Sequence, residues 1–177
     1  MSAVTPKLTY ADYLCYPADG NRHEIVGGDH YMNPAPSTYH QQIAQRLNHQ
    51  LYTQIDLPGH GRVFFAPIDV QLGEHDIVQP DLLVVLAANR VISPSRIMGA
   101  PDHVVEILWP RSGNYDRKLK RSLYQRAGVK EYWIVDPEDA AVMQLVLTPA
   151  GYEIREHGDI LLASYLPEVR VDLRNVW

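Results

Sequence analysis

The sequence predicts a single domain of the α/β class, covering residues 1–177, in which a mixed α+β sheet is flanked by helices. A chain of 177 residues with 46% hydrophobic residues is long enough to bury one core. Strand-like alternation and helix-like spacing of apolar residues both occur along it. A strand, a helix and a second strand are expected within residues 103–135, and this order predicts a right-handed parallel crossover.

The first half of the chain is expected to hold two helices and five strands. Thr9 is a favourable N-cap for the first helix, and Gly27-Gly28 is a hairpin signal between the first two strands. Apolar residues recur at the spacing of one helical face between Ile43 and Ile55, which predicts the second helix. The expected elements are helices over residues 10–14 and 39–54 and strands over residues 22–26, 29–32, 62–66, 68–72 and 77–85.

The second half is expected to hold the crossover and a C-terminal set of strands. Residues 86–102 have an irregular pattern, and Gly128 is expected to end the crossover helix. The expected elements are strands over residues 103–108, 131–135, 142–147, 152–157 and 160–163 and helices over residues 115–127 and 172–176.

The composition indicates the cellular compartment expected for the protein. No apolar run approaches the ~20 residues needed to cross a bilayer, so we expect no membrane span. The N-terminus lacks a basic region followed by an apolar one, so we expect no secretion. The single cysteine, Cys15, cannot form an internal disulfide, which fits a reducing compartment. The expected location is the cytoplasm.

Charge is distributed unevenly along the chain. The total of −5 is unfavourable for a protein that coats nucleic acid. Residues 111–130, however, hold seven Lys and Arg against one Asp, a local charge of +6 that leaves −11 for the rest. This basic segment either contacts a phosphate backbone or forms a solvated helix face, and the sequence leaves both possibilities open.

Two acids stand in or beside apolar strands. Glu106 lies within the apolar run 104–108, and Asp81 follows Pro80 at the start of a second apolar run. A carboxylate in a buried strand is costly unless it is compensated. Two such acids on neighbouring strands would supply the oxygen ligands that Mg²⁺ prefers. Alternatively, each is a strand-end residue that faces solvent or accepts a backbone N–H bond.

A lysine of the crossover helix is directed toward the same place. At ~100° per residue, Leu119 and Leu123 define the apolar stripe of this helix, and Lys120 lies at the edge of the stripe. Asp116 falls inside the stripe, four residues before Lys120, in the favourable order for an ion pair. Lys120 therefore either reaches the site of Glu106 or covers the core with its stem and pairs with Asp116.

Six segments together resemble a known family. They are HEIVGG (23–28), PAPSTYHQ (34–41), VQPDL (78–82), VVEIL (104–108), DRKLK (116–120) and GVKEYWIVDP (128–137). The chain resembles the PD-(D/E)XK nuclease superfamily and, more closely, the Uma-two family of restriction endonucleases. The resemblance covers most of the chain, and the last two segments are its most distinctive part.

The resemblance implies a restriction-endonuclease-like core, in which an antiparallel meander plus a βαβ crossover build one metal site. Asp81 and Glu106, helped by the backbone carbonyl of Ile107, would bind Mg²⁺ or Mn²⁺. Leu108 stands where the superfamily pattern has its lysine. The family supplies this lysine from the following helix, which implies Lys120.

Three further residues enter through the same resemblance. Glu24 matches an N-terminal acid of the family and would complete the catalytic group. Gln79 and His40 are weaker candidates for the site.

Two classes of function are therefore expected. The first is a metal-dependent endonuclease that hydrolyses DNA, with a homodimer placing two sites on one duplex. The second is a catalytically silent nuclease-fold protein that binds or assembles within a defence or mobile-element system, which the acidic composition favours. In the first class, the residues expected to contact DNA are Arg111, Arg117, Lys118 and Arg121.

Overall fold

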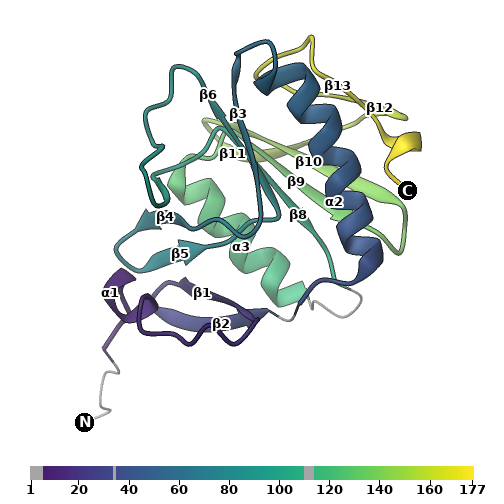
Figure 1. Ribbon diagram of the computed structural model, residues 1–177. Coiled ribbons are helices and arrows are strands. Elements are labelled where there is room, and N and C mark those ends of the chain that lie inside the picture. The colour runs from purple at the N-terminus through teal and green to yellow at the C-terminus, as the bar shows by residue number, and fades with distance from the viewer. Residues whose placement is uncertain (1–5, 34, 110–113) are drawn as a thin grey trace.

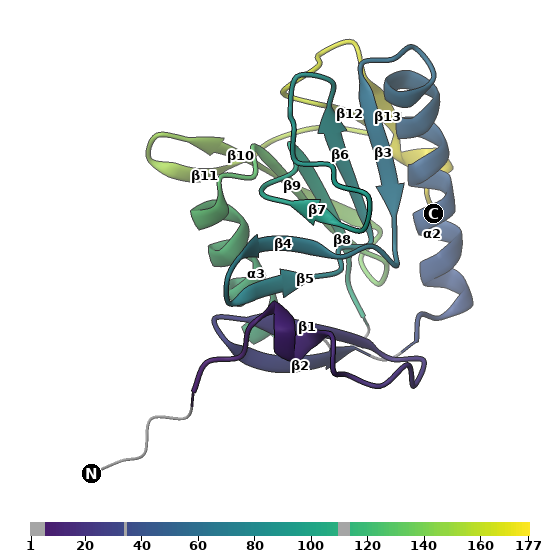
Figure 2. The ribbon, with the colours of Figure 1, turned by 60° about the vertical axis from the view of Figure 1, so that its left-hand side comes forward.

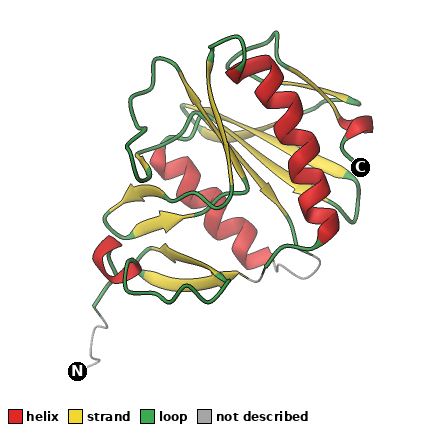
Figure 3. Ribbon diagram, in the orientation of Figure 1, coloured by secondary structure: helices red, strands yellow, loops and turns green. Residues whose placement is uncertain are grey.

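The fold is a mixed α and β structure with two long helices on opposite faces of a six-stranded sheet (Figure 1, Figure 3). The computed structural model describes residues 6–33, 35–109 and 114–177, with side chains from residue 118 onward in the last range. A five-stranded sheet packs beside the first sheet, and a two-stranded sheet lies near the C-terminus. The predicted fold class is confirmed.

The six-stranded sheet contains the predicted crossover. Its order is β11-β10-β9-β8-β6-β3. The strands are β3 (Gly61–Phe65), β6 (Leu82–Leu86), β8 (His103–Ile107), β9 (Glu131–Asp136), β10 (Ala141–Thr148) and β11 (Gly151–Arg155). Strands β8 and β9 are parallel and are joined by helix α3 (Asn114–Ala127), which confirms the crossover. The other neighbouring pairs are antiparallel.

The five-stranded sheet begins with the predicted hairpin. Its order is β2-β1-β5-β4-β7. The strands are β1 (Arg22–Val26), β2 (Asp29–Asn33), β4 (Val70–Gly73), β5 (Asp76–Val78) and β7 (Ile97–Met98). Gly27 and Gly28 make the turn with φ values of 63° and 88°. This left-handed conformation is readily adopted by glycine, so the two-glycine signal correctly located the hairpin.

The single strand predicted over residues 77–85 is wrong. The segment forms β5 and β6, which belong to different sheets. Pro80 lies between them and has no backbone N–H, so it cannot continue a strand ladder. Asp81 therefore stands where the chain passes from one sheet to the other, and its carbonyl accepts a bond of 3.0 Å from the Ala66 N–H.

Helices α2 (Thr38–Leu51) and α3 cover opposite faces of the six-stranded sheet (Figure 2). Ile43 and Leu47 of α2 pack in the cluster that contains Leu82. Leu123 of α3 packs in the cluster that contains Leu83. Successive residues of β6 thus serve the two cores, because side chains alternate along a strand. Continuous apolar runs in the sequence correspond to this two-sided burial.

The ends of the chain add short elements. Helix α1 (Tyr10–Tyr13) begins after Thr9 as predicted, and a π-helical segment (Tyr52–Asp56) extends α2. Near the C-terminus, β12 (Ile160–Leu162) corresponds to the strand predicted over residues 160–163, whereas its partner β13 (Arg170–Asp172) was not predicted. The helix predicted over 172–176 is a 3-10 turn (Leu173–Asn175). Among the described residues, no helix is both long and apolar enough to cross a membrane.

Candidate active site

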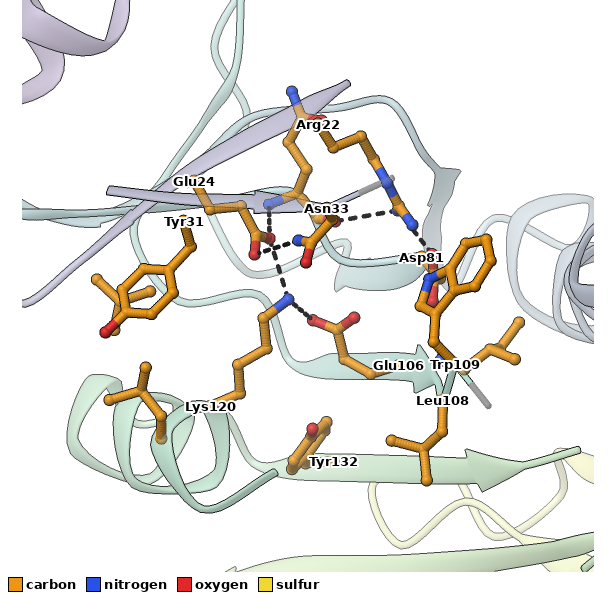
Figure 4. A pocket seen from close by; sticks show the side chains of 14 residues that line it. Arg22, Glu24, Tyr31, Asn33, Asp81, Glu106, Leu108, Trp109, Lys120 and Tyr132 are labelled. Carbon is orange, nitrogen blue, oxygen red and sulfur yellow. Dashed lines mark hydrogen bonds and ion pairs between the residues drawn. The ribbon is translucent and has the colours of Figure 1, made fainter. Parts of the chain in front are cut away.

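A pocket lies between the β1–β2 hairpin, the six-stranded sheet and α3 (Figure 4). It brings together the four predicted catalytic residues, which come from β1, the β5–β6 connection, β8 and α3. An arginine of β1 joins them. The charged residues that line the pocket are Arg22, Glu24, Asp81, Glu106 and Lys120.

Both carboxylate oxygens of Asp81 have partners. Oδ1 accepts a bond of 2.7 Å from Nη1 of Arg22. Oδ2 accepts a bond of 2.8 Å from the Ile107 N–H and lies 3.1 Å from Nε2 of His40. Burial raises the pKa of Asp81, but these partners outweigh it and hold the pKa below its ordinary value. Asp81 is therefore ionised although it is buried.

Lys120 lies between two carboxylates. Its Nζ donates to Oε1 of Glu106 at 2.9 Å and to Oε1 of Glu24 at 3.0 Å. Of the two interpretations of Lys120, the structure therefore supports the one that directs it to Glu106; the side chain of Asp116 lies outside the described residues. Burial lowers the pKa of Lys120, but the two carboxylates raise it above its ordinary value. Lys120 is therefore protonated at neutral pH.

Glu24 holds Lys120 in place through a fixed set of bonds. Its Oε1 also accepts from the Gln79 N–H at 2.8 Å, and its Oε2 accepts from Nδ2 of Asn33 at 2.8 Å. Only 1% of Glu24 is exposed. The Gln79 side chain points elsewhere, to Asp69 and Tyr13. Glu24 thus contacts the lysine directly, while Gln79 contributes its backbone.

Glu106 is in a less favourable electrostatic position than Asp81. The Tyr124 hydroxyl donates to its Oε1 at 2.7 Å, beside the bond from Lys120. Burial raises the pKa of Glu106, Lys120 opposes this rise, and the charges of Asp81 and Glu24 add to it. The neighbouring carboxylates therefore give this end of the pocket an excess of negative charge.

The donor set suits a small divalent cation. Among the described residues that line the pocket, three carboxylates face two cationic side chains. Protein sites for Mg²⁺ commonly use one or two carboxylates and retain several waters. Within the described ranges, no three His, Cys, Asp or Glu side chains are grouped to hold a metal ion. A metal site here would rest on Asp81 and Glu106, and the ligand roles of these two residues and of the Ile107 carbonyl stay predictions.

The structure describes the side chains of two of the four residues expected to contact DNA, and these two have different surroundings. Lys118 is exposed on α3. Arg121 is half-buried, and its Nη2 donates to the Tyr152 carbonyl at 3.2 Å, so this residue, which was expected to contact DNA, fastens α3 to β11. Arg111 and the side chain of Arg117 lie outside the described residues.

Several contacts of the site were missed by the sequence reasoning. Arg22 was detectable, because it stands two residues before Glu24 and shares its strand face. Tyr124 stands one helical turn after Lys120 on the same side of α3. Asn33 is the β2 partner of Arg22, and that register depends on the hairpin. No local signal indicated that Trp109 stacks on His40, with ring centroids 5.4 Å apart.

Comparison with solved structures finds the same fold in another protein. The crystal structure of a "putative nuclease belonging to DUF820" from Anabaena variabilis superposes with a TM-score of 0.78. The match covers 96% of this chain and 97% of that chain at 19% sequence identity, so it shows a shared fold.

The family model of Uma2, described as "Putative restriction endonuclease", matches residues 10–174. The chain belongs to this family, which confirms the resemblance seen in the sequence. No curated protein matches the sequence.

Proposed function

We propose that this protein is a metal-dependent endonuclease that hydrolyses DNA phosphodiester bonds. The observation that carries the proposal is the meeting of Asp81, Glu106 and Lys120 in one pocket, with Lys120 Nζ 2.9 Å from Glu106 Oε1. A binding protein has no evident need for a buried lysine between acids beside a second carboxylate on a neighbouring strand. The family described as restriction endonucleases supports the same reading.

The carboxylates would hold the metal. Asp81 and Glu106, with the Ile107 carbonyl, are the proposed ligands of Mg²⁺ or Mn²⁺. When bound, such an ion polarises the phosphate and lowers the pKa of a coordinated water. The contacts to His40 and the Ile107 N–H fix the orientation of Asp81 before any ligand arrives.

Lys120 acts in this proposal as a fixed positive charge. Because its pKa is raised, it stays protonated and cannot serve as a general base at neutral pH. It can donate hydrogen bonds to the attacking water or to the phosphoryl oxygens, where negative charge develops. Glu24 keeps Nζ in the pocket and acts as a positioning residue.

The basic segment would hold the DNA backbone. Lys118 is exposed beside Lys120 in the sequence and is suited to contact a flanking phosphate, which positions a substrate without reading its sequence. Arg111 and Arg117 stay candidates for the same role. A homodimer also stays a prediction.

A cleavage assay with matched variants tests the proposal. Plasmid, linear and branched DNA are incubated with Mg²⁺ or Mn²⁺ and with wild-type protein, Asp81→Asn or Asp172→Asn. Asp172 forms a surface pair of 2.7 Å with Arg174, and its variant controls for the loss of a carboxylate. Asp81→Asn should lose more than about 100-fold in rate, since even indirect metal partners contribute 10–100-fold.

The outcomes separate the two classes of function. Cleavage by wild type and Asp172→Asn, with loss in Asp81→Asn, supports the nuclease. Equal cleavage by all three proteins points to a different centre or a contaminant and refutes the role of this site. DNA binding without cleavage on any substrate favours the catalytically silent binding protein. One observation favours that alternative: Arg22 already holds Asp81 Oδ1.

A further inference from the structure

Arg22 holds one carboxylate oxygen of Asp81 at the wall of the pocket. Oδ2 of Asp81 is turned to the Ile107 N–H and to His40, which is 5% exposed. Oδ1 is turned to Arg22, whose side chain lines the pocket and is 15% exposed (Figure 4). Oδ2 thus already has two partners, so Oδ1 is the oxygen better placed to bind a ligand that enters through the pocket, and Arg22 holds that oxygen at 2.7 Å.

The guanidinium of Arg22 has more donors than this contact uses. Nη1 donates to Asp81 and approaches the Gln79 carbonyl at 3.5 Å. In the described part of the chain, the buried Nε has no hydrogen-bond partner. A buried N–H without a partner carries a free-energy penalty that a new acceptor would relieve. The rigid fork of an arginine matches two oxygens of a phosphate, which a lysine cannot do.

We infer that Arg22 is the resident cation of the metal site and a ligand of the substrate phosphate. In the metal-free protein it neutralises Asp81. When a divalent cation takes Oδ1, the guanidinium is released into the pocket, and its fork then contacts a phosphate oxygen of the DNA. The inference rests on the proposed nuclease function and adds a role for a residue that the superfamily pattern does not contain.

The charges of the pocket are consistent with this exchange. A metal–Asp81 pair would replace the Arg22–Asp81 pair, so the negative charge of Asp81 has a cation beside it at every stage. The released guanidinium meets a phosphate, which carries the opposite charge. Lys120 does not take part, because it is held by Glu24 and Glu106 at 3.0 Å and 2.9 Å.

The test measures Mn²⁺ affinity by calorimetry and, at saturating Mn²⁺, the rate of DNA cleavage. The variants are Arg22→Met, Arg22→Lys and Arg174→Met. Arg174 forms an arginine–aspartate pair of the same 2.7 Å length on the surface, so it is the matched control. Thermal unfolding without metal confirms that each variant is folded.

Removal of the positive charge of Arg22 should strengthen metal binding. We expect Arg22→Met to bind Mn²⁺ about tenfold more tightly than wild type, because a charge-assisted bond to Oδ1 no longer has to break. The same variant should cleave DNA at least about tenfold more slowly with metal saturated, through a raised KM. Arg22→Lys should bind Mn²⁺ near the wild-type affinity but cleave slowly. Arg174→Met should match wild type in both.

Three results would overturn the inference. If Arg22→Met binds Mn²⁺ equally or more weakly than wild type does, then Arg22 only orients Asp81. If it binds more tightly but cleaves at the wild-type rate, Arg22 does not contact the phosphate. If neither wild type nor any variant binds Mn²⁺, the proposed nuclease function fails together with the inference. Should Arg22→Met not fold, Arg22→Lys decides: a wild-type cleavage rate refutes the phosphate contact.

Discussion

His103 at the start of β8 makes the stability of the protein depend on pH. Its ring is fully buried, with Nδ1 2.9 Å from the Tyr165 hydroxyl and its centroid 4.3 Å from that of Trp133. Burial lowers the pKa of His103 to about 4 from an ordinary 6.5, and the charge of Glu131 opposes this shift. Between these two values the unfolded chain binds a proton that the folded protein excludes.

The sign and size of the effect follow from proton linkage. Since the folded pKa is depressed, the contribution is fully present above pH 6.5 and declines as the pH falls toward 4. For this shift, the free energy of unfolding should fall by about 2 kcal/mol between pH 7.5 and pH 5, out of about 3 kcal/mol for the complete titration.

Urea unfolding of wild type and His103→Gln at several pH values measures the contribution of His103 to the free energy of unfolding. Other groups titrate in both proteins, so their contributions cancel in the difference between the two unfolding free energies. The unfolding free energy of wild type minus that of the variant should decrease by about 2 kcal/mol as the pH falls from 7.5 to 5. A difference that stays constant to within about 0.5 kcal/mol would refute the claim that His103 is kept neutral by burial.

Two shorter predictions concern the site and its support. Lys120→Ala should lose more than about 100-fold in DNA cleavage while it still binds Mn²⁺ in calorimetry, and retained cleavage would remove its role. Ser37 accepts a bond of 3.2 Å from the His40 N–H at the start of α2. Ser37→Ala should lower the unfolding free energy by about 1 kcal/mol. Ser37→Asp should keep it, and equal losses in both variants would contradict capping.

Much of the fold was predictable where local pattern and tertiary role agree. The crossover over β8, α3 and β9 was predicted correctly because an apolar run, a helical spacing of apolar residues and a second apolar run follow one another there. The strand expected over 77–85 failed for a physical reason: apolar residues continue across Pro80 although the chain changes sheets. Hydrophobic pattern reports burial, and it does not report which sheet buries a residue.

The candidate site was predictable in part for a related reason. A carboxylate in an apolar strand is conspicuous because its burial demands a partner, and this identified Glu106 and Asp81. The identity of the partners depends on tertiary contacts. Arg22 and Tyr124 supply bonds from 59 and 18 residues away in the sequence: their spacing to Glu24 and Lys120 indicates the side on which they lie, but it does not indicate which carboxylate each one contacts.

The order of strands has a consequence for synthesis of the protein. Successive segments of the chain contribute strands to one large sheet and then to the other. Lys120 follows its partner Glu24 by 96 residues in the sequence. A ribosome releases residues from the N-terminus onward. A polypeptide interrupted before α3 holds Glu24 and Glu106 but lacks the lysine that lies between them. Fragments of unfinished translation are therefore inert toward DNA under the proposed mechanism, and the cell encounters the assembled group of charges only after α3 has been made.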